Sequence, residues 1–138
     1  MLKTIEKLIK PVYAHCDLPC GIYETDTMRH AADTCRRMVE RYEEIGELVS
    51  TDAEAMNKAV RAVQTKEDHA QKCKDQLYLL WSDYFKPEHL DKFPDMHDKF
   101  WQATKQCGKV KQTMSIAECD KLVEMVHGIG HMFADSKK

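Results

Sequence analysis

Apolar residues near the start of the chain recur with the period of an α-helix. From about Thr25 to Val49, the apolar residues Met28, Cys35 and Tyr42 are spaced seven residues apart. Positions with this spacing lie on one face of a helix, while the positions between them face water. The pattern predicts a first helix over 25–49 with one face against a core.

A second stretch with the same period follows after a short link. Thr51 and Glu54 have the spacing of a capping box, which predicts that a helix starts there. The helix is expected to end near Phe85, because Pro87 cannot continue it. The residues expected to face the core are Met56, Val60, Val63, Ala70, Cys73, Leu77 and Leu80.

Two shorter helices are predicted in the last third of the chain. Pro94 suits the first turn of a third helix, which is expected to stop at Gly108. Ser115 and Glu118 form another capping box. The fourth helix that follows carries apolar residues at helical spacing, namely Cys119, Leu122, Val126, Ile129 and Phe133.

Four amphipathic helices with short links, and no strand pattern, predict an all-α four-helix bundle. The 138 residues (16.0 kDa) are of a size for one domain. The formal net charge of −2 gives no broad attraction to nucleic acid or to a membrane surface, so neither is an expected partner. The sequence also lacks an apolar run of about 18 residues, the length of a membrane-spanning helix.

The side chains best suited to binding a metal lie close together outside the predicted helices, in residues 15–23, which read HCDLPCGIY. One imidazole (His15) and two thiols (Cys16 and Cys20) fall within six residues, and such groups bind soft and borderline transition metals. If the chain were cut after Ala14, His15 would also offer a free amine and Cys16 a backbone amide. Two nitrogens and two sulfurs in one loop favour a square-planar site, which suits nickel or copper(II).

Spacing alone leaves other interpretations open. A zinc site, a Cys16–Cys20 disulfide and two unpaired thiols are all compatible with this pattern. Of the four remaining cysteines, those on apolar stripes are expected to be buried, and they are Cys35, Cys73 and Cys119. Cys107, beside Gly108, is expected to be more exposed.

Two blocks of the sequence resemble signatures of the nickel superoxide dismutases. The first is HCDLPCGIY itself, which is similar to the nickel-binding hook at the start of the mature chains of that family. The second is WSDYFKP at 81–87, followed at matching spacing by His89, Phe93-Pro94 and His97. The blocks are separated by residues 24–80, and the resemblance extends over 15–138. It implies a four-helix bundle with an N-terminal metal-binding hook.

The resemblance also implies a set of metal ligands, with one nickel ion per subunit. His15 would bind through its amine and, in the oxidised state, its imidazole. Cys16 would bind through its backbone nitrogen and its sulfur, and Cys20 through its sulfur. Pro19 corresponds to the family's cis-proline, which would turn Cys20 toward the metal.

Further roles follow from the same resemblance. Tyr23 would stand over the open face of the metal as a gate, and Lys86 is the second candidate catalytic residue. The hydrogen-bonded surroundings of the site would include Asp17, Asp83 and Tyr84, together with Lys86.

The chain departs from the family at one point. A glutamate and an arginine support the histidine imidazole in the family, and Ala31 and His69 stand at the matching positions. His69 could support the His15 ring directly or through water, or it could be an ordinary polar residue on a long helix.

The implied reaction converts two superoxide ions and two protons to dioxygen and hydrogen peroxide by Ni(III)/Ni(II) cycling. Residues 1–14 correspond to a propeptide removed by a protease, and residues 15–138 to the enzyme domain. The leader lacks the apolar core of a signal peptide, so a cytoplasmic location is expected, with an organelle transit peptide as an alternative. The family implies a homohexamer.

Two other classes of function remain open from the sequence. One is a non-catalytic metal-binding or metal-delivery module that uses the same hook. The other is a structural helical bundle with a disulfide between Cys16 and Cys20.

Overall fold

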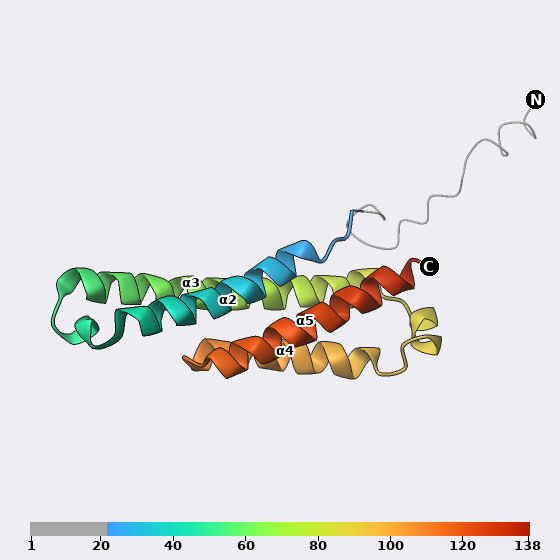
Figure 1. Ribbon diagram of the computed structural model, residues 1–138. Coiled ribbons are helices and arrows are strands. Elements are labelled where there is room, and N and C mark those ends of the chain that lie inside the picture. The colour runs from blue at the N-terminus through green and yellow to red at the C-terminus, as the bar shows by residue number, and fades with distance from the viewer. Residues whose placement is uncertain (1–21) are drawn as a thin grey trace, which may run out of the picture.

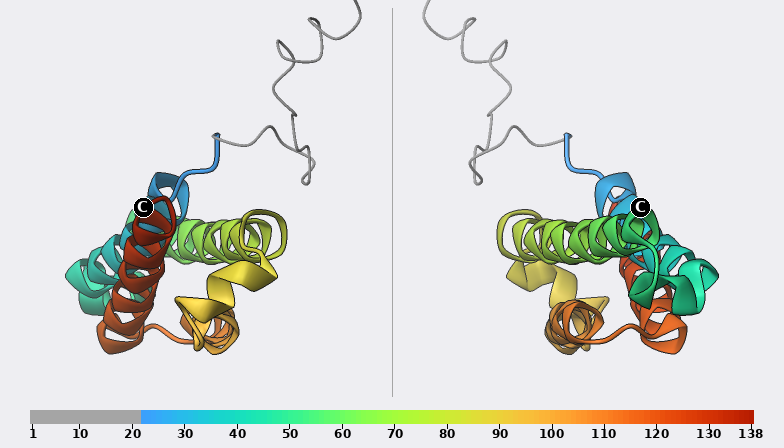
Figure 2. Two further views of the ribbon diagram at one scale, coloured as in Figure 1. Left: turned by 90° about the vertical axis from the view of Figure 1, so that its right-hand side faces the viewer. Right: turned by 90° about the vertical axis from the view of Figure 1, so that its left-hand side faces the viewer.

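The computed structural model describes residues 22–138, and these form a bundle of four α-helices (Figure 1). The helices are α2 (Asp26–Ile45), α3 (Ala53–Leu79), α4 (Met96–Gln112) and α5 (Ile116–Ser136). Seen along its long axis, the bundle places the four helices around a shared interior (Figure 2). The predicted all-α fold is confirmed, and residues 22–138 contain no strand.

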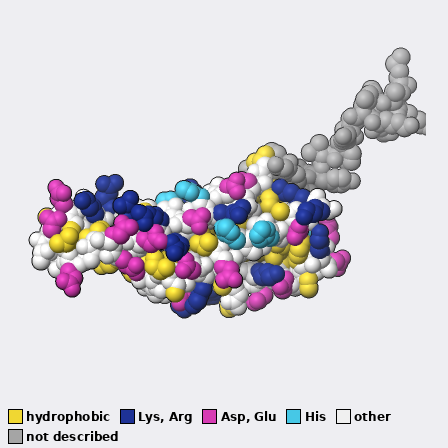
Figure 3. Space-filling view, viewed as in Figure 1, with side chains coloured by type: hydrophobic (Ala, Val, Ile, Leu, Met, Phe, Trp, Pro, Cys, Tyr) yellow, Lys and Arg dark blue, Asp and Glu magenta, His cyan; other side chains and the backbone are white. Residues whose placement is uncertain are grey.

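Three short elements connect these helices. A 3-10 turn, Gly46–Ser50, lies between α2 and α3. A π-helical segment, Leu80–Tyr84, ends α3, and a second 3-10 turn, Pro87–Asp91, leads toward α4. None of the helices over 22–138 is both long and apolar enough to cross a membrane. On the face in Figure 3, charged side chains of both signs are interspersed.

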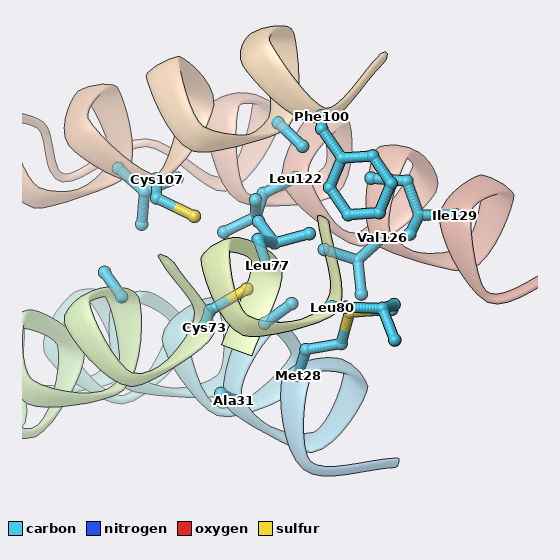
Figure 4. Packing of buried hydrophobic residues seen from close by; sticks show 14 of the residues in the cluster. Met28, Ala31, Cys73, Leu77, Leu80, Phe100, Cys107, Leu122, Val126 and Ile129 are labelled. Carbon is cyan, nitrogen blue, oxygen red and sulfur yellow. The ribbon is translucent and has the colours of Figure 1, made fainter. Parts of the chain in front are cut away.

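The core contains one cysteine from each helix. Cys35, Cys73, Cys107 and Cys119 are all fully or almost fully buried, and all four are free thiols. Figure 4 shows Cys73 and Cys107 among the larger apolar side chains of the core. Burial of the first, second and fourth of these thiols confirms the prediction, whereas the expected exposure of Cys107 is wrong. Cys107 is buried because α4 continues past Gly108 and keeps its side chain on the core face.

The link between the first two helices differs from the prediction by a few residues. The α2 helix ends at Ile45, four residues before the predicted end, because Gly46 adopts a φ of 58°. Only glycine takes up such a conformation at little cost. The predicted cap at Thr51 is also wrong. The N-cap of α3 is Asp52, whose carboxylate accepts a hydrogen bond from the Ala55 N–H at 2.8 Å.

The third helix also has different ends from those predicted. It begins at Met96, so Pro94 lies in the preceding turn rather than in the first helical turn. It runs through Gly108 and ends only at Gln112. The predicted start of the fourth helix is confirmed, since Ser115 caps α5 by accepting a hydrogen bond from the Glu118 N–H.

A buried lysine explains where α4 ends. The Lys66 side chain is almost completely buried, and its ammonium donates to the carbonyl oxygens of Val110, Lys111 and Thr113 at 2.7, 2.7 and 2.9 Å. The last carbonyls of a helix lack partners within the helix and carry its negative dipole end. Lys66 therefore caps α4 from the neighbouring helix, which a local sequence pattern cannot predict.

Candidate functional site

The second signature block forms the end of α3 and the turn after it. Leu80–Tyr84 is π-helical, and Phe85 then takes an extended conformation that ends the helix. Such π-helical segments are uncommon and often occur at functional sites. Phe85 is buried at this change of geometry, and its neighbours Tyr84 and Lys86 are both half-buried.

Tyr23 and Tyr84 lie in contact, although they come from the two different signature blocks. Tyr23 precedes α2 and is 6% exposed, and its ring meets the Tyr84 ring edge-on at a centroid distance of 5.6 Å. Tyr84 also packs against Phe133 of α5, with ring centroids 4.6 Å apart. The end of the hook motif is thus held against the WSDYFKP block by aromatic packing.

The hydroxyl group of Tyr84 has a defined hydrogen-bond direction. Its oxygen lies 2.7 Å from Ser136 Oγ, and the Ser136 hydroxyl in turn donates to the Phe133 carbonyl oxygen at 2.7 Å. A hydroxyl has only one proton to give. Because Ser136 gives its proton to Phe133, Tyr84 is the donor to Ser136 and keeps lone pairs for another partner.

Lys86 and Asp83 have different surroundings. The Lys86 ammonium lies 3.9 Å from Glu88 Oε1, and its side chain is 36% exposed. This pair is too open and too long to neutralise the ammonium. The Ser82 hydroxyl lies 2.7 Å from the Tyr78 carbonyl oxygen and 2.8 Å from Asp83 Oδ1, so these two acceptors share its one proton. The Lys86 charge is therefore available at the surface, where Lys86 lines a recess with Trp81 and Phe85, whereas Asp83 stabilises its own turn.

His89 is a supporting residue of this cluster whose role the sequence did not show. Its Nδ1 accepts the backbone N–H of Lys86 at 2.9 Å, which fixes the neutral ring with its proton on Nε2. The ring is stacked on Tyr84, with centroids 5.8 Å apart and planes within 9°, and it meets Phe85 edge-on at 5.4 Å. One feature of the sequence could have indicated this role. His89 follows Lys86 by three residues, which is the spacing of a capping box, and Pro87 between them starts a helical turn.

Two surface recesses flank the aromatic cluster. One, of about 410 Å³, is bounded by Tyr23 and by the cationic side chains of Arg29 and Lys137. The other, of about 310 Å³, is bounded by Lys86 and Trp81. Either recess is large enough for a small anion with its hydration water. The acidic side chains of Glu24 and Asp26 also line the first recess, so its charge is mixed.

The structure does not bring His69 to this cluster. His69 lies on α3, fifteen residues before Tyr84, which corresponds to roughly 20 Å along the helix. Its Nδ1 donates to the Thr65 carbonyl oxygen at 2.9 Å, so Nε2 is the acceptor nitrogen of the neutral ring. The ring packs edge-on against His30 of α2, with centroids 6.4 Å apart. Ala31, at the other departing position, is fully buried.

The predicted metal ligands precede the described part of the chain. His15, Cys16 and Cys20, and with them Asp17 and Pro19, lie outside residues 22–138. Within 22–138, no group of three or more His, Cys, Asp or Glu side chains could hold a metal ion. The donor set of the hook, with nitrogen and thiolate ligands, fits nickel chemically. Of the described aromatic cluster, Tyr23 lies three residues after Cys20 in the chain.

The structure defines a helical-bundle protein, and its sequence has the residue types of a transition-metal site before the first described helix. Residues 10–137 match the family model of the nickel-containing superoxide dismutases. The chain is 32% identical over 127 residues to the superoxide dismutase [Ni] of Streptomyces seoulensis, which covers 92% of this chain and 91% of that protein. The same identity and coverage hold for the superoxide dismutase [Ni] of Streptomyces coelicolor.

The similarity extends to three dimensions. A native structure of a nickel superoxide dismutase superposes with a TM-score of 0.75 at 31% identity, covering 90% of this chain and all of the other. The chain therefore belongs to the family of nickel-containing superoxide dismutases, which are oxidoreductases with a nickel cofactor.

Proposed function

We propose that this chain disproportionates superoxide to dioxygen and hydrogen peroxide at a nickel ion held by the hook. The observation that carries this proposal is the contact between Tyr23 and Tyr84, with ring centroids 5.6 Å apart. These residues belong to the two motifs on which the family resemblance rests, and the fold packs the motifs together. Family membership over residues 10–137 supports the same activity.

The ligands that we assign are His15, Cys16 and Cys20. His15 contributes its amine and imidazole, Cys16 its backbone nitrogen and sulfur, and Cys20 its sulfur, with one nickel ion per subunit. When bound, nickel would supply a one-electron Ni(III)/Ni(II) couple, which thiolate donors make accessible. Pro19 and Asp17 shape and support the loop.

The described residues would attract the substrate and relay protons to it. Lys86 places a positive charge at the surface, two residues after Tyr84 in the chain, and a surface cation raises the local concentration of a small anion such as superoxide. Tyr23 is almost fully buried, and we assign it the role of a gate over the metal that would limit the entry of bulk water. The Tyr84 oxygen, with its proton directed to Ser136, can hold a water molecule through its lone pairs. Tyrosines of this kind can relay the protons that the reaction consumes.

The active chain would begin at His15. An acylated nitrogen at residue 15 is an amide and a far poorer ligand than an amine, so residues 1–14 must be removed by a protease. Residues 15–138 are then the enzyme domain. The cytoplasm is the compartment that we propose, because the leader has no apolar signal-peptide core. By resemblance to the family, the assembly is a homohexamer.

Substitution of the sulfur ligands tests this function against a non-catalytic metal-delivery module. Cys16→Ser and Cys20→Ser should each abolish dismutation, because a hydroxyl is a harder donor than a thiolate. Cys35→Ser is the matched control, since it changes a buried thiol of the bundle instead. Nickel content and superoxide decay are measured on the same samples. Wild-type dismutation by a nickel-loaded Cys20→Ser chain would contradict the ligand assignment, and a nickel-loaded, trimmed chain without activity would favour the delivery module.

A further inference from the structure

The last turn of α5 reaches the aromatic cluster at the end of α3. Ser136 is the final residue of α5, and its hydroxyl oxygen lies 2.7 Å from the phenol oxygen of Tyr84, 52 residues earlier in the chain. Phe133, one turn before Ser136, packs on the same tyrosine with ring centroids 4.6 Å apart. The end of α5 thus meets Tyr84 at both its ring and its hydroxyl group.

Two lysines hold this last turn in place. Lys92, in the segment before α4, donates from its ammonium to the Asp135 carbonyl oxygen at 2.8 Å. The Lys137 ammonium lies 3.9 Å from the centre of the Phe133 ring, which is a cation–π contact. The last carbonyl groups of a helix lack partners within the helix, so its end frays unless other groups bind it. Tertiary contacts therefore define the position of the Ser136 hydroxyl.

The hydrogen bonds of Ser136 run in one direction. Its hydroxyl donates to the Phe133 carbonyl oxygen at 2.7 Å, so it acts toward Tyr84 as an acceptor. The phenol proton of Tyr84 therefore points to α5. A group that approaches the phenol oxygen from another side meets only lone pairs. A water molecule at this place donates one proton to Tyr84 and keeps its other proton for a second acceptor.

This role differs from that of the other residues around Tyr84. His89 and Phe133 contact the ring and set its place, and Tyr23 meets it edge-on. Contacts to a ring leave the hydroxyl free to turn about its C–O bond. The acceptor on α5 removes that freedom, because the phenol has one proton and Ser136 receives it.

We propose that Ser136 is a positioning residue for proton delivery in the dismutation reaction. Superoxide that gains an electron takes up two protons as it becomes hydrogen peroxide. A water molecule that donates to the Tyr84 oxygen presents its other proton to this substrate, and solvent then returns a proton to the water. Tyr84 and Ser136 keep their own protons, so their part in the relay is to orient the donor. The inference rests on the proposed function and names a residue that sets its proton geometry.

The test uses the nickel-loaded enzyme that begins at His15 and measures kcat and KM for superoxide. Ser136→Ala removes the acceptor and should lower kcat about tenfold, with little change in KM because Lys86 is untouched. Ser136→Thr keeps a hydroxyl and should stay within about twofold of the wild type. Ser50→Ala is the matched control and should leave kcat unchanged. Ser50 makes the same kind of bond, to the carbonyl oxygen three residues earlier at 2.9 Å, in the turn between α2 and α3.

Two further measurements separate positioning from a loss of structure. The solvent deuterium isotope effect on kcat should rise in Ser136→Ala, because proton delivery then limits the rate. A smaller fraction of folded enzyme would leave this isotope effect unchanged. Tyr84→Phe keeps the ring and removes the phenol, so adding Ser136→Ala to it should cause no further loss of kcat.

Ser136→Ala with the kcat and the isotope effect of the wild type would overturn the proposal. So would a loss of kcat that Ser136→Thr fails to restore, or one that is equally large when Tyr84→Phe is already present, since Ser136 would then not act through Tyr84. A nickel-loaded wild-type chain without dismutation would contradict the proposed function and this inference with it. An active wild type whose rate ignores the Ser136 hydroxyl would contradict this inference alone.

Discussion

The imidazole of His89 accepts the backbone N–H of Lys86 at 2.9 Å while its ring lies flat against Tyr84, with planes within 9°. One side chain therefore sets both the turn that carries the Lys86 ammonium and the orientation of the Tyr84 ring. If this cluster guides superoxide, both contacts contribute to the rate.

Two substitutions at His89 separate these contacts. His89→Phe keeps a ring against Tyr84 but removes the acceptor, so stability should fall by about 1 kcal/mol, as for a lost helix cap. Its kcat/KM should fall roughly tenfold, because Lys86 is no longer held in place. His89→Asn keeps an acceptor at this position, so kcat/KM should stay closer to that of the wild type and should fall with added salt, which screens the Lys86 charge from superoxide. Equal values of kcat/KM for the two variants would show that the hydrogen bond from the Lys86 N–H to residue 89 has no role in catalysis.

Lys66 should be among the residues most important for stability. Lys66→Met keeps the buried apolar stem but leaves three carbonyl groups at the end of α4 without their donor. The free energy of unfolding should fall by about 3 kcal/mol, as measured by urea denaturation. Lys72→Met, at an exposed position of the same helix, should change it by less than about 0.5 kcal/mol. If Lys66→Met lowered the free energy of unfolding only slightly, water would be replacing the ammonium as the donor to these carbonyl groups.

The buried thiols predict a loss of stability in alkali. Burial raises the pKa of Cys35 to about 12 and that of Cys119 to about 11, from a usual value of 9.0. Below pH 9 these thiols are protonated in both folded and unfolded chains. Between pH 9 and pH 12 the unfolded chain loses the protons first, so the free energy of unfolding falls as pH rises.

The corresponding measurement compares urea denaturation at pH 8 and pH 10. Cys35→Ala should be less stable at pH 8 because it leaves a cavity, but its stability should fall less steeply toward pH 10. Identical slopes for the variant and the wild type would show that Cys35 ionises equally in both states.

His69 has a separate test. If it supports the His15 ring, His69→Ala should keep its nickel, because the amine, the backbone nitrogen and the two thiolates would hold the ion without it. Turnover should fall by about tenfold, with a weaker imidazole nitrogen signal in the electron paramagnetic resonance spectrum of the oxidised protein. An unchanged spectrum and an unchanged rate would make His69 a bystander that packs on His30 and the Thr65 carbonyl.

Helical period in the sequence predicts the four helices, but not the places where they end. Gly46 ends α2 and Gly108 does not end α4, although both are glycines near a predicted boundary. The difference lies in tertiary structure, because Lys66 from another helix stabilises the longer α4. The helical period also cannot show that Met56 is exposed and Leu77 is buried. The two residues share one register, and only Leu77 is covered by another helix.

For the candidate site, the sequence predicts the kind of chemistry but not the contacts between residues. The residue types in the hook indicate a transition-metal site, and family resemblance selects nickel and the second motif. Neither pattern shows that Tyr23 contacts Tyr84, or that His89 supports Lys86, because these contacts join segments far apart in sequence or depend on a local turn. The separation of His69 from this cluster likewise follows only from the fold.

The central claim is that a free amine at His15 completes the nickel site. The most direct measurement compares the full chain with the chain of residues 15–138 for nickel content and superoxide decay under identical loading. The chain that begins at His15 should bind one nickel per subunit and be active, whereas the chain that begins at Met1 should be inactive. Full activity from a chain that mass spectrometry shows to be still intact at Met1 would contradict the account.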